Sequence, residues 1–210
     1  MKKDSNKKKW LFRILILVVL IVIGIFLVSL IIKSSIAPED KIAVVKIYGP
    51  ISLDGSSSSI IPSSSVNSQQ ILDDIAKIKK DSSIKGVIFE INSPGGTVVA
   101  SEEIAHAVKE LNIPKYAVIR EVGASGGYWI ASATDKIIAS PMSITGSIGV
   151  ISSYLEFSGL FEKYGVNYQR LVSGDFKDMG TPYKDLTPEE QAKMQNKLML
   201  FMNILLKKFQ

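Results

Sequence analysis

The feature that most constrains this chain is an apolar run over residues 14–32 that contains no charged side chain. A helix of that length is about 28 Å long at 1.5 Å per residue, close to the ~30 Å hydrocarbon core of a bilayer. Trp10 and Phe12 precede the run, at the position where aromatic rings favour a membrane interface. The sequence therefore predicts a transmembrane helix over residues 14–32.

Basic residues flank the run unevenly. One lysine, Lys33, follows it directly, whereas the residues before it include Lys2, Lys3, Lys7, Lys8, Lys9 and Arg13. The positive-inside rule then places the N-terminus in the cytoplasm and the rest of the chain outside. We expect a single-pass protein of the cell membrane, and we interpret the basic tail as a determinant of this topology rather than as a nucleic-acid arm.

This interpretation divides the chain into four segments: a cytoplasmic tail (1–13), an anchor (14–32), a linker (33–40) and an extracytoplasmic domain (41–210). A cleaved signal peptide is the alternative, because Ser35-Ile36-Ala37 has the small-x-small pattern of a cleavage site. The run is longer than the 7–15 residues usual in a signal peptide, which favours an uncleaved anchor.

Strand and helix patterns alternate through the domain. The expected strands are 41–51, 84–91, 116–122, 136–139, 147–151 and 167–172; the expected helices are 68–80, 98–111, 125–133, 157–164 and from 187 to near the C-terminus. Ser68 is the expected cap of the first of these helices, and the serine-rich residues 52–66 are expected to form an exposed loop. This alternation predicts βαβ units and an α/β domain with a mostly parallel sheet.

Ser125 lies in a Gly-Ala-Ser-Gly-Gly turn directly after a predicted strand, and a serine needs a neighbouring base to become a nucleophile. The only histidine, His106, precedes Ser125, which excludes the chain order of α/β-hydrolases. No aspartate separates the two, which excludes the chymotrypsin order. The subtilisin order stays formally open with Asp73, Asp74 or Asp81, but His106 falls in an amphipathic helix pattern. A lysine base is therefore favoured.

Two further features of the sequence bear on this chemistry. The turn Ser93-Pro94-Gly95-Gly96 also follows a predicted strand, and its glycines suit backbone amides that point into an oxyanion hole. Gly96 is the preferred donor, and Gly126, the amide after the serine at a helix N-terminus, is the second. The chain has no cysteine, which excludes a thiol nucleophile and thiolate metal sites, and we expect neither metal nor cofactor.

Four motifs occur in a fixed order: Asn92-Ser-Pro-Gly-Gly96, Gly123-Ala-Ser-Gly-Gly-Tyr128, Thr145-Gly-Ser-Ile-Gly-Val150 and Ser173-Gly-Asp-Phe-Lys-Asp178. The series resembles the signal peptide peptidase A (protease IV) family of membrane-anchored serine proteases, over about residues 42–195. One anchor before one protease domain is similar to the short, Gram-positive-type members of that family.

The resemblance implies a ClpP/crotonase-like α/β fold with Ser125 as nucleophile and Lys177 as general base. Ser147 matches the serine that orients the lysine amine. A lysine acts as a base only when neutral, which burial away from acids favours. The family implies ring-like homo-oligomers in which the serine and the lysine of a site come from neighbouring protomers, and substrates that are remnants of signal peptides or other apolar peptides.

Members of the family usually continue past the length seen here, so the resemblance implies a shortened C-terminal region. The apolar helix pattern at 197–209 is expected to pack into a core that is only partly present. The leading hypothesis is a Ser-Lys endopeptidase. The alternatives are an inactive, truncated paralogue that binds peptides or protomers, and a crotonase-type acyl-thioester enzyme, for which the ordered serine and lysine motifs and an anchor would be unnecessary.

The predicted topology can be tested with a protease added to intact spheroplasts. Because the charges before residue 14 hold the tail inside, we expect digestion of the domain and protection of an N-terminal epitope tag. Digestion of the domain only after lysis would contradict the outward orientation.

Overall fold

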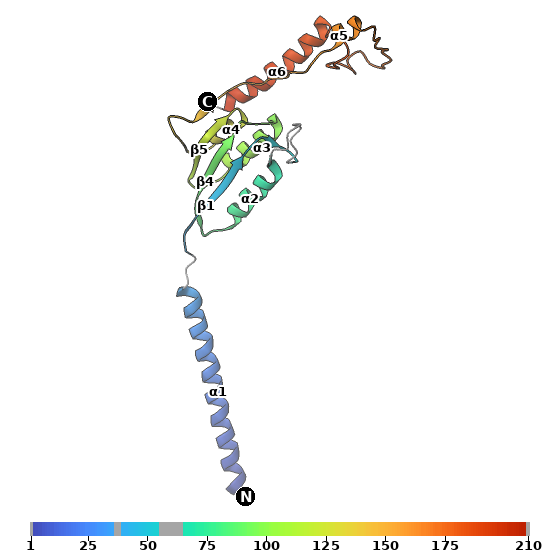
Figure 1. Ribbon diagram of the computed structural model, residues 1–210. Coiled ribbons are helices and arrows are strands. Elements are labelled where there is room, and N and C mark those ends of the chain that lie inside the picture. The colour runs from blue at the N-terminus through green and yellow to red at the C-terminus, as the bar shows by residue number, and fades with distance from the viewer. Residues whose placement is uncertain (1, 36–38, 55–64, 209–210) are drawn as a thin grey trace. The chain divides into compact units, whose positions relative to one another are not determined.

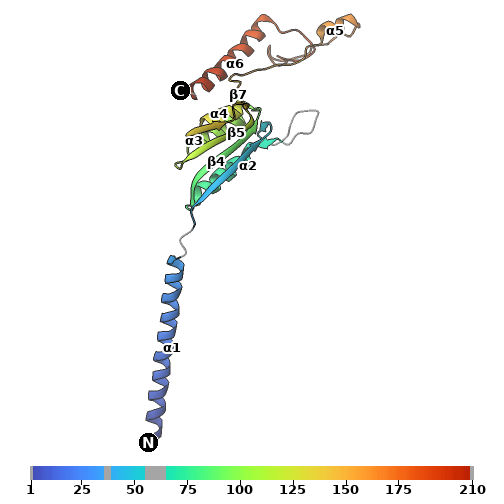
Figure 2. The same ribbon diagram turned by 60° about the vertical axis from the view of Figure 1, so that its left-hand side comes forward.

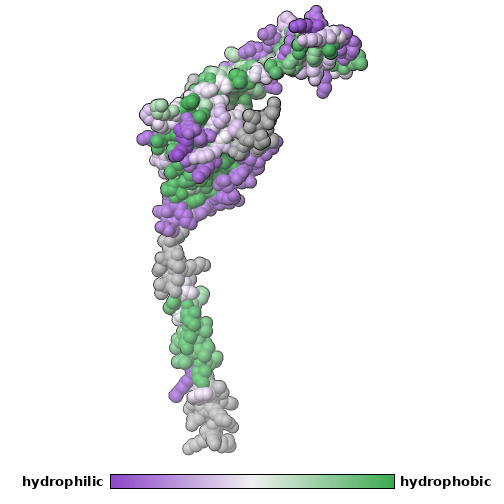
Figure 3. All heavy atoms as spheres, viewed as in Figure 1, coloured by the Kyte–Doolittle hydropathy of each residue, from purple (hydrophilic) through white to green (hydrophobic). Residues whose placement is uncertain are grey.

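The computed structural model describes residues 2–35, 39–54 and 65–208, in two compact units, Met1–Lys41 and Ile42–Gln210 (Figure 1). The first unit is helix α1 (Lys2–Ser35). Its segment Phe12–Ser29 has a mean hydropathy of 3.0 and is, by length and composition, the one described stretch able to cross a membrane. Figure 3 shows hydrophobic side chains along it. Most of the predicted serine-rich loop, residues 55–64, lies outside the described residues.

The second unit contains a five-stranded sheet in the order β1 (Lys41–Tyr48), β4 (Ile84–Ser93), β5 (Lys115–Ala124), β6 (Lys136–Ala139). The fifth strand, β7 (Ile144–Gly146), also pairs with β5. Strand β5 is parallel to β4, β6 and β7, and these last two pair with successive parts of it. The short strands β2 (Ile51–Ser52) and β3 (Val66–Asn67) form a separate parallel pair.

Three helices cover one face of this sheet: α2 (Ser68–Lys80), α3 (Val98–Lys109) and α4 (Gly126–Ser132). All three are labelled in Figure 2. Alternate strand residues point toward them, as the period of two requires. The buried core comprises Val45, Ile47, Val87, Phe89, Ile91, Ala117 and Ile119 from the strands and Ile71, Ile75, Ile78, Ile104 and Val108 from the helices. The predicted α/β class, a mostly parallel sheet with one apolar N-terminal helix, is confirmed.

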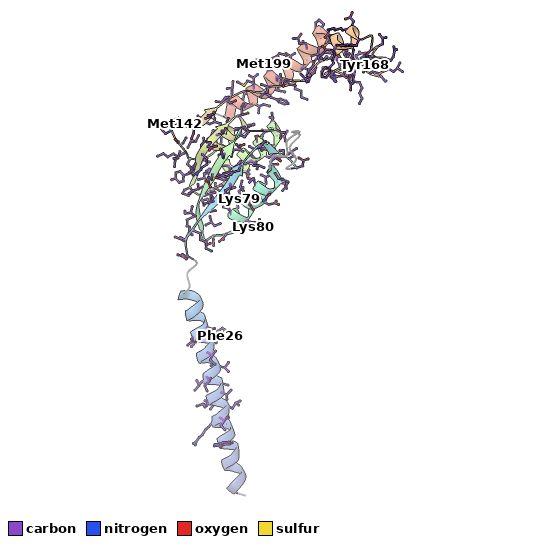
Figure 4. The ribbon with its side chains drawn as sticks, viewed as in Figure 1. Phe26, Lys79, Lys80, Met142, Tyr168 and Met199 are labelled. Carbon is purple, nitrogen blue, oxygen red and sulfur yellow. The ribbon has the colours of Figure 1, made fainter. Side chains whose placement is uncertain are left out.

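The other face of the sheet is more open. Its exposed large apolar side chains are Ile42, Val44, Tyr48, Tyr116 and Ile138. Met142, between β6 and β7, is 88% exposed (Figure 4). Burial on one face and exposure on the other explain why burial alternates along β1 from Ile42 to Tyr48.

Residues 151–208 follow β7, and we call residues 152–200 the arm. It contains α5 (Ser158–Lys163), a series of turns, and most of α6 (Pro188–Lys208). Thr187 begins α6 as predicted: its Oγ1 accepts from the Glu190 amide at 3.2 Å, while Glu190 Oε2 accepts from the Thr187 amide at 2.9 Å. This reciprocal pair is a capping box. Near the end of α6, Leu205 joins the core of the sheet, whereas Met199 and Leu200 stay exposed.

Three details of the predicted elements are wrong. Asn67, not Ser68, caps α2: its Oδ1 accepts from the amides of Gln69 and Gln70, and Ser68 is the first helical residue. The predicted strand at 147–151 is absent because Gly146 and Ser147 both have positive φ, 86° and 53°, which ends β7. The predicted strand at 167–172 is irregular: the sequence Asn167-Tyr-Gln-Arg-Leu-Val172 does not alternate past Gln169, and no strand among the described residues pairs with it.

Replacing Asn67 tests the corrected cap. Asn67→Ala leaves two amides of α2 without their acceptor, so we expect a loss of about 1 kcal/mol in the free energy of unfolding, measured by urea denaturation of the detergent-solubilised chain. The exposed Gln70→Ala is the matched control and should change it by less than about 0.5 kcal/mol. Equal effects of the two substitutions would argue against the cap.

Candidate active site

The junction between β5 and α4 places Ser125 in a strained conformation. The strand ends at Ala124 and the helix begins at Gly126, so this one residue makes the whole turn, with φ 50° and ψ −121°. Such a conformation costs a residue other than glycine on the order of 1–3 kcal/mol and is typical of functional sites. In the described residues only Ser125 and Ser147 combine a side chain with positive φ. Both are candidate site residues from the sequence.

Glycines allow the end of β4 to approach this turn. A Cβ on Gly95, which has φ +95°, would lie 2.8 Å from the Cβ of Ser125 and 2.7 Å from the amide nitrogen of Gly126. A Cβ on Gly127 would lie 2.9 Å from the Ser93 carbonyl oxygen. The backbone therefore packs against Ser125 where any side chain would collide, and this contact holds the serine in its turn.

The two predicted oxyanion donors lie beside each other. The amide of Gly126 is the first of α4, so it has no acceptor within the helix. A Cβ on Gly126 would lie 3.5 Å from the Gly96 amide nitrogen. Two backbone hydrogen bonds with Ile51 hold the Gly95–Thr97 turn: Ile51 N donates to Gly95 O, and Thr97 N donates to Ile51 O, each at 2.9 Å. The Gly96 amide takes no part in these bonds.

Strand pairing brings the Ser147 segment alongside Ser125. Ala124 pairs with Gly146 in the parallel ladder, and the Ser125 amide donates to the Gly146 carbonyl at 2.8 Å. Ser147 is the next residue after that carbonyl. The two strained serines therefore follow paired positions on neighbouring strands, at the carboxyl end of the sheet where α/β proteins bind ligands.

Lys177 is the predicted site residue that the structure does not bring to Ser125 within one chain. It lies in a turn of the arm, its side chain is exposed, and its amine makes no hydrogen bond or ion pair with any described residue. The Ser125 hydroxyl likewise has no hydrogen bond among the described residues.

His106 lies on the surface of α3, as predicted. Its side chain is 63% exposed, and its Nε2 is 3.2 Å from Glu110 Oε1. Among the aspartates considered, Asp73 accepts from Gln69 and Asp74 pairs with Lys77 on their own helix. The subtilisin-like arrangement therefore has no support in the described residues.

An apolar cavity of about 480 Å³ adjoins the Gly96 turn. Its mostly apolar walls come from five segments of the chain: residues 52–54 (Ser52, Leu53 and Asp54), the start of α3 (Thr97, Val98 and Val99), Glu102 of α3, Trp129 of α4, and Phe201 and Ile204 of α6. Trp129 is buried, and Tyr128 is packed against the same core. The cavity could not be predicted from the sequence, because residues of α6, distant in the chain, complete it.

The chain has clear relatives. The model of peptidase family S49 matches residues 107–208. A protein of Enterococcus faecium assigned as signal peptide peptidase SppA is 40% identical over 166 residues, which cover 78% of this chain and 48% of that protein. A protein of Methanocaldococcus jannaschii assigned as a protease is 34% identical over 197 residues, 89% of this chain and 63% of its own length. Protease 4 of Haemophilus influenzae is 35% identical over 160 residues, 72% of this chain and 25% of that enzyme.

Among solved structures, a membrane-bound stomatin-specific protease matches with 21% identity and a TM-score of 0.46, over 56% of this chain and 49% of that one. A ClpP1 variant of Listeria monocytogenes matches with 23% identity and a TM-score of 0.36, over 43% and 46%.

The fold is of the α/β class, and the family model that matches its C-terminal half is that of peptidase family S49. More narrowly, the chain belongs to the signal peptide peptidase A family. It spans about half to two thirds of the length of its first two relatives.

Gly96 offers a test of the site geometry. A Cβ there would lie 1.9 Å from the Ile51 carbonyl oxygen, so Gly96→Ala must displace the turn that carries the amide. We expect reaction with a serine-directed fluorophosphonate probe to slow by about 10²-fold, because a 1 Å misplacement has that effect.

The control is Gly149→Ala. Gly149 has no atom within 4 Å of an added Cβ and no positive φ, so labelling should be unchanged. Normal labelling of Gly96→Ala would show that the Gly96 amide is not an oxyanion donor.

Proposed function

We propose that this chain is a membrane-anchored serine endopeptidase that uses Ser125 as its nucleophile and Lys177 as its general base. The observation that carries the proposal is the strained backbone of Ser125 between β5 and α4, held by the glycine contacts of the neighbouring turn. The proposal extends the family membership to the chemistry of this chain.

In the proposed reaction the neutral Lys177 amine takes the proton of the Ser125 hydroxyl as Oγ bonds to the scissile carbonyl carbon. The amides of Gly96 and Gly126 donate to the oxyanion that forms. The carbonyl then re-forms, the peptide C–N bond breaks, and the lysine returns its proton to the leaving amine. Water attacks the resulting ester by the same route, which releases the second product and restores the serine.

Ser147 follows the position that pairs with Ala124, so its hydroxyl is well placed to orient an amine that approaches Ser125. Because Lys177 is exposed on its own arm and without a partner among the described residues, we infer that it serves the Ser125 of a neighbouring protomer. The active form would then be a homo-oligomer.

The substrate class is inferred from the cavity beside Gly96. Its walls of valine, tryptophan, phenylalanine and isoleucine favour an apolar side chain of an extended peptide. Remnants of signal peptides meet this requirement and occur at the membrane to which α1 would tether the domain. We propose the orientation given by the basic tail, with the site on the extracytoplasmic side.

A second candidate is an inactive protein that binds peptides or protomers. The observation that favours it is that the Ser125 hydroxyl has no hydrogen bond to a base among the described residues, because a serine without a base is a poor nucleophile. The two candidates differ in whether Ser125 reacts covalently.

Probe labelling of the full chain in detergent separates them. We expect a fluorophosphonate to label the wild type, and Ser125→Ala and Lys177→Ala each to reduce labelling and peptide hydrolysis to background. Combining the two should cost little more, since residues that act as one unit are not additive.

His106→Ala is the control and should label like the wild type, because its side chain is on the surface of α3. An unreactive wild type would favour the binding protein, and an active Lys177→Ala would refute the base.

A further inference from the structure

The turn that carries Lys177 is rigidly built despite the exposure of the lysine. Three backbone hydrogen bonds close successive turns: Lys177 N to Gly174 O at 3.2 Å, Met179 N to Phe176 O at 3.3 Å, and Thr181 N to Asp178 O at 3.1 Å. Gly174 and Gly180, with φ of 100° and 81°, stand at its two ends. The backbone around Lys177 therefore has a defined course.

Both neighbours of Lys177 are anchored on the arm. The ring of Phe176 lies 4.3 Å from the Lys193 amine of α6. The Asp178 carboxylate, only 11% exposed, accepts two bonds from Arg170: from Nε to Oδ2 at 2.7 Å and from Nη2 to Oδ1 at 2.9 Å. The side chains on either side of Lys177 are thus fixed to the arm, whereas that of Lys177 is exposed.

The pair belongs to a larger network that reaches α6. Lys184 lies 3.9 Å from Asp178 and donates to Glu190 at 2.7 Å. Glu190, whose side chain is 3% exposed, is also the residue that closes the capping box with Thr187. The turn, the following loop and the start of the helix are thus held by one chain of charges.

We propose that Arg170 and Asp178 are positioning residues for Lys177: their bidentate pair presents the lysine amine outward and keeps the adjacent carboxylate from binding it. The inference rests on the proposed function, in which Lys177 must be neutral. A planar guanidinium suits this role, since it fixes both oxygens of the carboxylate at once.

Charge explains why the engagement of Asp178 matters. A free carboxylate within ~4–6 Å of an amine stabilises its charged form, which is useless as a base. The bonds from Arg170 lower the pKa of the Asp178 carboxyl and raise that of the guanidinium, so the pair stays ionised and closed at neutral pH. The other charged or titratable groups of this part of the arm include Asp175, Lys184, Asp185, Glu189, Glu190 and Lys193, with Tyr168 near Arg170.

The test compares three variants of the full chain in detergent: Arg170→Met, Arg170→Met with Asp178→Asn, and Arg170→Lys. Two readouts are followed against pH, probe labelling of Ser125 and acylation of the Lys177 amine by acetic anhydride, located by mass spectrometry. The second readout does not require an active serine.

With Arg170→Met we expect the pH of half-maximal labelling, and that of acylation, to rise by about one unit or more, because Asp178 is released toward the amine. The added Asp178→Asn should return both half-maximal pH values to those of the wild type, since the carboxylate is removed. For Arg170→Lys the two half-maximal pH values should lie between those of the wild type and of Arg170→Met, because lysine keeps the positive charge but cannot donate the paired hydrogen bonds of a guanidinium. Lys163→Met, which removes a cation elsewhere on the arm, should shift neither.

An unchanged acylation profile in Arg170→Met would overturn the inference, as would a shift that Asp178→Asn fails to reverse, since loss of structure alone is not rescued by a second loss. Failure of the proposed function looks different: Lys177→Ala would label like the wild type, whatever the acylation profiles show.

Discussion

The contact between the glycine turn after β4 and the start of α4 is the constraint on which the rest of the site depends. With no side chain at Gly95, the backbone lies where an added Cβ would be 2.7 Å from the Gly126 amide. This approach leaves no space for a longer turn, so Ser125 alone reverses the chain at a positive φ. The same packing sets the two candidate oxyanion amides side by side and turns the serine toward the carboxyl end of the sheet.

The sequence predicted the parts of this arrangement that are encoded locally. The strands β4 and β5, the helix α2 and the start of a helix at Thr187 appear as expected, because burial and short-range hydrogen bonds decide them. What it missed depends on distant or competing partners. Asn67 accepts from the first amides of α2 whereas Ser68 is buried as the first helical residue, and residues 167–172 have no paired strand among the described residues.

The candidate residues divide into two groups by location. One group lies at the end of the sheet, where strand pairing and glycine contacts bring together Ser125, Ser147, Gly96 and Gly126. The ordered motifs of the sequence predicted these residues as site residues. Lys177 lies on the arm, where side chains contact one another, such as Phe161 with Tyr183 and Arg170 with Asp178. No sequence pattern shows that Arg170 binds Asp178, because the turns between them set their approach. The nucleophile and the oxyanion amides thus lie at the end of the sheet, whereas the proposed base is exposed on the arm.

The central claim, that Ser125 and Lys177 of different chains form one site, is tested most directly by mixing two inactive variants. Ser125→Ala supplies only the lysine and Lys177→Ala only the serine, so neither should react with the fluorophosphonate probe alone. After co-solubilisation and exchange of protomers, the account predicts labelling of Ser125 on the Lys177→Ala chain, identified by a tag of different mass. Labelling that stays at background in a mixture shown by light scattering to be co-assembled, while the wild type reacts, would contradict it.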